Sequence, residues 1–355
     1  MKLTPLAAAL ATATALAIGL PAAAQSSVTL YGIADGSVRH VRGLSATNQP
    51  GSASVWLQSS GINRTSRWGF RGSEDLGGGL RATFNLESGF NIDTGLQADA
   101  IKFWDRAAVL GLQGPIGTLT LGRQNTLLAD ALGTVDPLNI RIAGFNPNVQ
   151  FAALAQHGLG QQYGATGSTT GSYRLDNSAK LVSDIGPVQL RAMVSAGEGA
   201  GGRGSGVAAG YRSGGFAAQA AYMRLNGSTA GRQLEAWIAG AGWRADWGTL
   251  RLSYAQSEGP TGVITKTEYR TIGLGGSFKL SAALELVVGH YDLRRERTSL
   301  ASDGFGRTVA FLEYALSRRT VLYVEADHTR WRDRYQGATA KASGSGLSSG
   351  IVHNF

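Results

Sequence analysis

The stretch Leu80-Arg81-Ala82-Thr83-Phe84-Asn85-Leu86-Glu87-Ser88-Gly89-Phe90 places apolar residues at most even positions and polar or small residues at odd positions. Successive side chains of a β-strand point to opposite faces, so this period of two predicts a strand with one apolar and one polar face. The same alternation appears in Val188 to Ser195, in Phe216 to Tyr222 and in Leu250 to Tyr254. An all-β fold is therefore predicted, although a soluble sandwich would alternate in the same way.

The connections between these segments separate the two all-β architectures. Very short turns alternate with long polar loops such as 164–171 and 197–206. The short turns are Asp75 to Gly79, Gly114 to Gly117, Ile185 to Pro187, Ser213 to Gly215 and Asp246 to Gly248. Short turns on one rim and long loops on the other are expected of a bacterial transmembrane β-barrel. Aromatic residues near strand ends fit the interface girdles of a barrel: Trp68, Phe70, Tyr211, Trp243, Tyr254 and Tyr314.

The alternating segments predict a 16-stranded antiparallel transmembrane β-barrel with short periplasmic turns and long external loops. The predicted strands are 27–40, 64–74, 79–92, 101–113, 117–124, 173–184, 187–197, 206–213, 216–226, 232–246, 249–258, 266–280, 284–297, 307–317, 320–334 and 344–355. Sixteen strands leave an aqueous channel rather than a lumen filled with side chains. A closed barrel cannot be cut into independent halves, so residues 25–355 are expected to form one domain.

Both ends of the chain predict export to the outer membrane of a Gram-negative bacterium. Residues 1–24 combine Lys2, an apolar segment from Leu6 to Leu20 and the cleavage pattern Pro21-Ala22-Ala23-Ala24, which predicts a removable signal peptide. The last residue, Phe355, follows a short alternating segment and is expected to act as an assembly signal. The rest of the chain lacks the run of about 18 apolar residues that a membrane-spanning helix needs.

The positive charge of the chain is large but dispersed. It holds 33 Lys and Arg against 24 Asp and Glu, a net charge of +9, and the loss of Lys2 with the signal peptide would leave +8. No block of five or six like charges appears, so no nucleic-acid partner is expected. Single arginines recur inside alternating segments, where a barrel would point them into its lumen. A basic lumen of this kind attracts anions.

One long segment, about 125–172, interrupts the alternation. It opens with Thr126 to Leu132, which could form a short helical turn. Long loops inside compact domains are usually functional or disordered. Disorder would leave few apolar residues, yet this loop carries Leu127, Leu128, Leu132, Val135, Ile140, Ile142 and Phe145. We therefore expect the third external loop to fold into the barrel and to narrow the pore.

Four short motifs give the chain a family resemblance. Ser27 to Gly32, Arg67 to Gly77, Leu121 to Gln124 and Arg174 to Ser178 resemble the general diffusion porins of Gram-negative bacteria, with the beta-proteobacterial branch as the most similar. The resemblance covers the mature chain and implies a homotrimer of barrels, each with its own pore. It also implies contacts with outer-membrane lipid and lipopolysaccharide, and recognition of the last strand by the barrel-assembly machinery.

The resemblance also implies a pore constriction in which wall arginines face acids of the third loop. By motif, the wall residues are Arg67, Arg106 and Arg174, and the loop residues are Asp130, Asp136 and Arg141. Other basic residues expected to face the lumen are Arg71, Arg81 and Arg123.

Strand parity supports Arg67, because Trp68 and Phe70 would face lipid. Strand parity supports a lumen-facing Arg106 less well. It would place Ala107 and Val109 on the outer face, which is acceptable, but it would also place Leu110 inside. Each arginine could instead pair with a lumen carboxylate such as Glu74 or Glu87.

The chain departs from the wider family after Pro137, where many members have a Pro-Glu-Phe-Gly turn and this sequence has Leu138-Asn139-Ile140-Arg141. A missing carboxylate and an added guanidinium predict a more positive constriction and a preference for anions. The implied function is passive diffusion of small hydrophilic solutes and ions through a fixed pore. A substrate-specific pore for phosphate or organic acids remains the alternative within the channel class.

Enzymatic chemistry has little support in the sequence. The five histidines are dispersed, and Asp327 cannot orient His328 because neighbouring strand residues point to opposite faces. The segment Gly240 to Ala245 fits a dinucleotide-binding pattern, but it lies inside an alternating strand rather than before a helix. No catalytic residue, metal or cofactor is expected. An outer-membrane barrel enzyme and an adhesin remain as alternatives from other classes.

Overall fold

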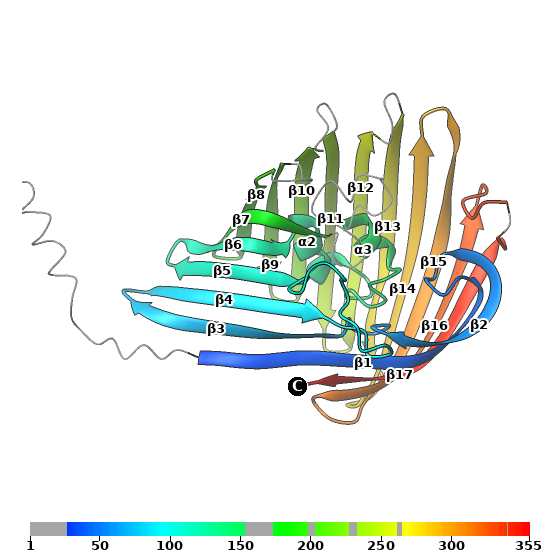
Figure 1. The fold of residues 1–355 in the computed structure, drawn as a ribbon, viewed down its shortest axis with the longest axis horizontal. Helices are drawn as coiled ribbons and strands as arrows, with labels where there is room; N and C mark the ends of the chain where they lie inside the picture. Colours follow the sequence, from blue (N-terminus) through cyan, green and yellow to red (C-terminus); the bar gives the residue numbers. More distant parts are fainter. Residues whose placement is uncertain (1–26, 153–172, 198–202, 227–232, 261–264, 339) are drawn as a thin grey trace, which may run out of the picture.

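The computed structural model describes residues 27–152, 173–197, 203–226, 233–260, 265–338 and 340–355. The predicted signal peptide, 1–24, and part of the predicted constriction loop, 153–172, lie outside these residues. None of the helices in the described part of the chain combines the length and the hydropathy needed to cross a membrane. The described residues form one antiparallel sheet that closes on itself (Figure 1).

Seventeen strand segments make this sheet. They are β1 (Ser27–Leu44), β2 (Pro50–Ser60), β3 (Arg67–Gly77), β4 (Leu80–Gly89), β5 (Ala107–Gly114), β6 (Gly117–Asn125), β7 (Arg174–Ile185), β8 (Val188–Ser195), β9 (Gly204–Ser213), β10 (Phe216–Asn226), β11 (Gln233–Ala245), β12 (Gly248–Pro260), β13 (Lys266–Lys279), β14 (Leu284–Arg297), β15 (Leu300–Ala315), β16 (Thr320–Arg332) and β17 (Ser343–Asn354). From β3 to β17 each strand pairs with the next, and β17 pairs with β1 to close the ring.

The strand segments β2 and β3 lie end to end along the same edge of β1. Gly36 to Leu44 of β1 pair with β2, whereas Ser27 to Ile33 pair with β3. The two segments therefore count as one interrupted wall strand, and the barrel has the predicted 16 strands. The sequence prediction missed β2, which it left between the predicted strands 27–40 and 64–74.

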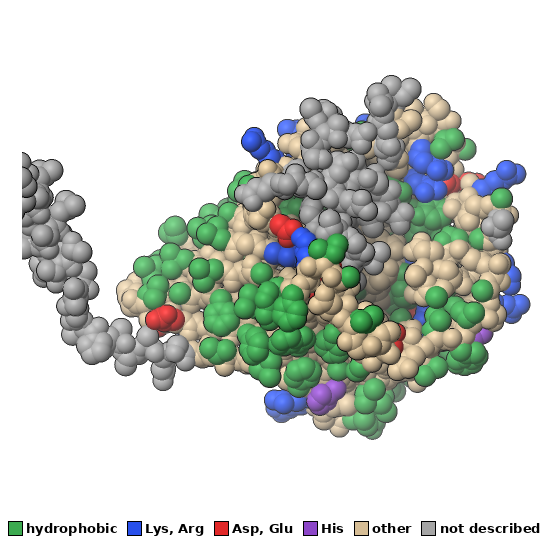
Figure 2. All heavy atoms as spheres, viewed as in Figure 1, with side chains coloured by type: hydrophobic (Ala, Val, Ile, Leu, Met, Phe, Trp, Pro, Cys, Tyr) green, Lys and Arg blue, Asp and Glu red, His purple; other side chains and the backbone are tan. Residues whose placement is uncertain are grey.

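The two faces of the wall follow the alternation in the sequence. On β5, Leu110 and Leu112 are 64% and 46% exposed on the outer face, while Val109 lies opposite Asn85 on the lumen face. The parity prediction that put Leu110 inside was therefore wrong. Figure 2 shows apolar side chains spread over the outer face of β3 to β6, as expected for a surface that meets lipid.

The third loop folds into the barrel and carries two helices, α2 (Leu127–Val135) and α3 (Pro147–Ala152) (Figure 1). Thr126 caps α2, because its Oγ1 accepts a hydrogen bond of 3.2 Å from the Ala129 amide. The apolar face of α2 packs against buried residues of the inner wall between β8 and β12. These wall residues are Met193, Ala208, Ala221, Met223, Leu225, Leu234, Ala236, Ile238 and Ala255.

Glycines on the inner wall let the loop approach the backbone closely. A Cβ added at Gly240 would lie 2.7 Å from Cβ of Val135, and one at Gly289 would lie 2.8 Å from Cδ2 of Leu138. Gly240 opens the segment that fits a dinucleotide-binding pattern, and it lies within β11 rather than before a helix. Its lack of a side chain leaves room for α2 and for the Leu252 carbonyl of β12.

Candidate pore constriction

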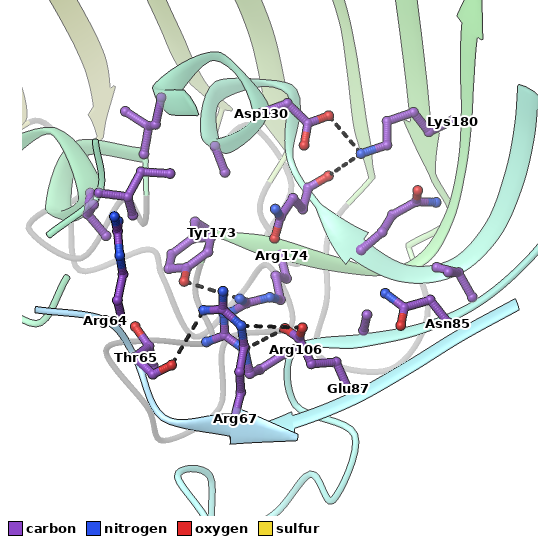
Figure 3. Close-up of a pocket in the computed structure, with 18 of the residues that line it drawn as sticks. Arg64, Thr65, Arg67, Asn85, Glu87, Arg106, Asp130, Tyr173, Arg174 and Lys180 are labelled. Atoms are coloured by element: carbon purple, nitrogen blue, oxygen red, sulfur yellow. Dashed lines mark hydrogen bonds and ion pairs between the residues drawn. The ribbon is translucent and has the colours of Figure 1, made fainter. Parts of the chain in front are cut away.

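The inward loop fills one side of the barrel and leaves a cavity of about 500 Å³ against the wall of β3 to β7. Wall residues line one side of this cavity, and α2 and the segment that follows it line the other (Figure 3). The charged lining residues are Arg64, Arg67, Glu87, Arg106, Asp130, Arg174 and Lys180. The structure thus brings the three predicted wall arginines together at one cavity.

Glu87 holds two of these arginines in place. Its Oε1 lies 2.6 Å from Nε of Arg106, and its Oε2 lies 3.5 Å from Nε of Arg67. The Tyr31 hydroxyl donates a hydrogen bond of 3.0 Å to Oε2. The pairing that the sequence left open as an alternative is therefore present for both arginines, yet both also line the cavity. Arg106 precedes β5, so its side chain reaches the lumen independently of strand parity.

Arg174 lies deeper in the wall and is 2% exposed. Its guanidinium stacks on the Tyr173 ring, with 4.2 Å from Cζ to the ring centroid, and its Nη2 donates to the Tyr173 hydroxyl at 3.1 Å. Burial alone would raise the pKa of the Tyr173 phenol, but the charges of Arg174 and Arg106 lower this pKa below its ordinary value. The lowered pKa of the Tyr173 phenol indicates a positive electrostatic potential at this part of the cavity.

The loop side of the cavity carries Asp130, whose charge is also compensated. Its Oδ2 lies 2.8 Å from Nζ of Lys180 and 3.4 Å from Nη1 of Arg191. Lys180 and Arg64 were missed by the sequence prediction. Lys180 could have been found from the alternation of β7, whereas Arg64 lies in the break between β2 and β3 and carried no periodic signal.

The other loop residues anchor the loop rather than face the cavity. Asp136 is fully buried and accepts hydrogen bonds from Ile140 N, Asn146 Nδ2, Asn148 Nδ2 and the Tyr291 hydroxyl.

Arg141, which the sequence predicted to add positive charge to the constriction, is buried instead against Glu313 of β15. Its Nε and Nη2 donate to the two Glu313 oxygens at 2.5 and 2.9 Å. Asp136 and Arg141 are therefore not among the residues that line the constriction cavity, although Arg141 lines an adjoining cavity.

The remaining predicted lumen arginines divide between the two faces of the wall. Arg71 stacks over the ring of Tyr31 on the lumen face, and Arg81 shares the lumen face of β4 with Asn85. Arg123 lies on the other face, contrary to the prediction that it faces the lumen. It follows Leu121 on the outer face of β6 and pairs in register with Ala108.

Arg123 is buried there, where its Nη1 lies 2.6 Å from Oδ1 of Asp176 and its Nε donates to the Asp105 carbonyl. At the end of the chain, Phe355 exchanges two backbone hydrogen bonds of 3.0 Å with Gly32.

The described histidines offer no catalytic arrangement. His328 is exposed on the outer face and hydrogen-bonds Ser345, whereas Asp327 points inward and pairs with Arg39 at 2.6 Å. Among the described residues, no group of three or more His, Cys, Asp or Glu could hold a metal ion.

Comparison with known proteins adds sequence relatives and solved structures. The family model described as Gram-negative porin matches residues 7–334. An outer membrane porin protein of Bordetella pertussis is 38% identical over 43% of this chain, and outer membrane porin protein 32 of Delftia acidovorans is 41% identical over 34% of it. The aligned parts span only 41% and 32% of those relatives.

The solved structures share the fold over nearly the whole chain. An anion-selective porin from Comamonas acidovorans covers 93% of this chain and 100% of its own, with 23% identity and a TM-score of 0.73. The trimer form of OmpT from Vibrio cholerae covers 93% of this chain and 99% of its own, with 14% identity and a TM-score of 0.68. Together with the match over residues 7–334, these likenesses confirm the resemblance seen in the sequence motifs. The chain belongs to the Gram-negative porin family.

Proposed function

We propose that this chain forms a water-filled channel in the bacterial outer membrane, through which small hydrophilic solutes and ions diffuse passively, with a preference for anions. The observation that carries the proposal is the charge of the 500 Å³ cavity. Its described lining holds five cationic side chains against two carboxylates, so the local potential is positive. Rings of charged side chains set ion selectivity in channels.

The surroundings of the cavity support passage of solutes rather than chemistry. The cavity lies between the wall of a 16-stranded barrel and an anchored loop, and such a barrel is wide enough for water. The name of the Comamonas acidovorans structure as an anion-selective porin agrees with the proposed selectivity.

The proposal includes the setting in which the channel works. We infer export with cleavage of residues 1–24 and assembly of three copies, each with its own pore. The last strand, which ends in Phe355, would be recognised by the barrel-assembly machinery, and the outer face would contact lipid and lipopolysaccharide. The trimer form of Vibrio cholerae OmpT supports oligomerisation within this architecture.

Single-channel recording tests the selectivity. The refolded protein is placed in a planar bilayer under a tenfold KCl gradient, and the reversal potential is compared with that of an R67S/R106S/R174S variant. We expect chloride preference in the parent protein and a clear loss of it in the variant. The control is R42S/R294S/R330S, which removes the same charge from exposed residues on the outer face. Cation preference in the parent, or equal shifts in both variants, would contradict the proposal.

A further inference from the structure

A second group of basic residues lies on the short-turn side of α2, away from the constriction. Three adjoining cavities of about 340, 150 and 270 Å³ follow the inner wall from β14 to β8. The first shares Arg64 and Asn139 with the constriction cavity and shares Arg244 and Arg251 with the second. The second shares Arg212 with the third. A solute that leaves the constriction therefore meets this middle cavity on a continuous path.

The middle cavity is shaped by one register row across four strands. Arg212 on β9 pairs with Ala217 on β10, Ala217 pairs with Gly242 on β11, and Gly242 pairs with Arg251 on β12. Neighbouring strands lie about 4.8 Å apart, so the two arginines start about 14 Å from each other. The positions between them carry only a methyl group and a hydrogen atom. The row thus leaves a hollow floor flanked by two long cationic side chains.

Arg244 and the last turn of α2 complete the cavity. Arg244 follows Gly242 by two residues on the same face of β11 and faces the cavity from the short-turn rim. Gly133 and Thr134 form the roof, with the Thr134 carbonyl 3.3 Å from the position of a Cβ on Gly242. The hydroxyl of Thr249 adds a neutral hydrogen-bonding group.

The charged side chains that line this middle cavity are all cationic. Its described lining contains Arg212, Arg244 and Arg251 and no carboxylate, whereas the adjoining cavities that share these arginines also contain Glu285 and Asp184. Within the part of the chain that the structure describes, none of the ion pairs involves these three residues, in contrast to Arg67 and Arg106 of the constriction. Arg212 and Arg244 are exposed to the lumen and Arg251 is half-buried, so a solute in the channel can reach all three.

We propose that Arg212, Arg244 and Arg251 form a binding site for a small multivalent oxyanion of the phosphate class, on the short-turn side of α2. Planar guanidinium groups bind phosphate oxygens in bidentate fashion, and three of them match a divalent tetrahedral anion. The site rests on the proposed channel function and refines it. The constriction attracts anions in general, and this cavity retains the multivalent ones before they leave the pore.

A purely structural role would have a different signature. The C-terminal end of a helix carries partial negative charge, and cations near it stabilise the helix. The arginines could serve only to neutralise the last turn of α2, which has no basic residue of its own. In that case their removal would weaken the fold and leave anion binding unchanged.

The test is inhibition of KCl conductance by inorganic phosphate at pH 8 and constant ionic strength. In the parent channel we expect a saturable decrease in single-channel current as phosphate is added. In R244Q/R251Q the concentration for half-inhibition should rise by roughly tenfold, as loss of charge-assisted hydrogen bonds predicts. The matched control is R71Q/R81Q, which removes two lumen arginines from β3 and β4 at the same end of the barrel and should leave the inhibition unchanged.

A second variant tests the shape of the site without removing charge. A217Q fills the hollow floor and keeps all three arginines, and it should weaken phosphate inhibition while leaving chloride preference intact. Open channels in every variant establish that the channel itself has formed, so loss of inhibition is distinguishable from loss of function. Unchanged inhibition in R244Q/R251Q, or equal weakening in R71Q/R81Q, would overturn the proposal. Equal inhibition by sulfate would support a site for divalent oxyanions.

Discussion

Nε of Arg106 lies 2.6 Å from Oε1 of Glu87, and the same carboxylate also faces Arg67. One acid therefore restrains two of the cations at the opening. The pair fixes the direction in which the guanidinium of Arg106 points, and it offsets part of the positive potential that a passing anion meets. Glu87 is thus expected to set the degree of anion preference, while the arginines set its sign.

Replacement of Glu87 by Gln should increase anion preference. The variant E87Q removes the negative charge and leaves Arg67 and Arg106 without their carboxylate partner. We expect the chloride-to-potassium permeability ratio, measured from the reversal potential, to rise about twofold or more, because a unit charge acts strongly at a few ångströms. The control E74Q changes an exposed carboxylate near the short-turn end of β3. Glu74 pairs in register with Ala82 on the outer face, contrary to the prediction that it faces the lumen. A lower chloride-to-potassium permeability ratio in E87Q would contradict this expectation and would mean that Arg67 and Arg106 had formed new ion pairs.

Anion preference should decline at alkaline pH because of Tyr173. Its phenol has a lowered pKa, so it ionises at a lower pH than an ordinary tyrosine and then adds a negative charge beside Arg174. The decline should therefore begin below the usual tyrosine value of about 10. Reversal potentials measured from pH 7 to pH 10 check this expectation. The variant Y173F should keep its preference over that range, and an identical decline in Y173F would assign the effect to another group.

The anchor between Arg141 and Glu313 should limit movement of the inward loop. In E313A the buried Arg141 loses its nearer carboxylate partner and keeps, among the described residues, only Glu285 at 3.9 Å. Removal of one member of a buried pair costs about 3–5 kcal/mol. We expect more frequent brief closures in single-channel records and a lower temperature for conversion of the folded band to the unfolded band on gels. The double variant R141M/E313L removes both charges and should recover much of the stability. Equal behaviour of E313A and the parent would show that the remaining loop contacts suffice.

The close approach of α2 to the wall should depend on Gly240. In G240A the added Cβ would lie 2.7 Å from Cβ of Val135 and closer still to the Leu252 carbonyl oxygen of β12, so both the strands and the helix must shift. We expect altered conductance and a less stable open state in bilayer recordings. G210A is the control, since a Cβ there has its nearest neighbour at 3.6 Å on the same inner wall. Conductance and stability equal to those of the parent in G240A would show that the approach of α2 to the wall at Gly240 does not limit conductance.

The barrel could be predicted from the sequence because its signals are local. Period-two alternation and glycine-rich turns identify strands without knowledge of their partners, and each turn fixes one neighbour. The segment Pro50–Ser60 escaped notice because small serines occupy both of its faces, so no contrast marks the alternation. Only its pairing with β1 identifies this segment as a strand.

The site was predictable only where motif and local parity sufficed. Arg67 and Arg174 were placed correctly at the cavity by motif. The pairing of Arg141 with Glu313 joins residues 172 positions apart, so the charge of Arg141 could not be judged from its neighbours. Arg123 was misplaced because the motif carried no information on which face of β6 it occupies.

The pairing of β1 with β17 has a consequence for how the chain reaches this shape. With β2 and β3 counted as one wall strand, every other pairing among the described strands joins neighbours in the chain, whereas this seam joins the first described strand to the last. Until β17 arrives, β1 and β16 each present a row of unsatisfied backbone groups, which is costly in lipid and favours pairing with other chains. The ring therefore cannot close until the final strand is available, and the open edges of β1 and β16 must be covered until then.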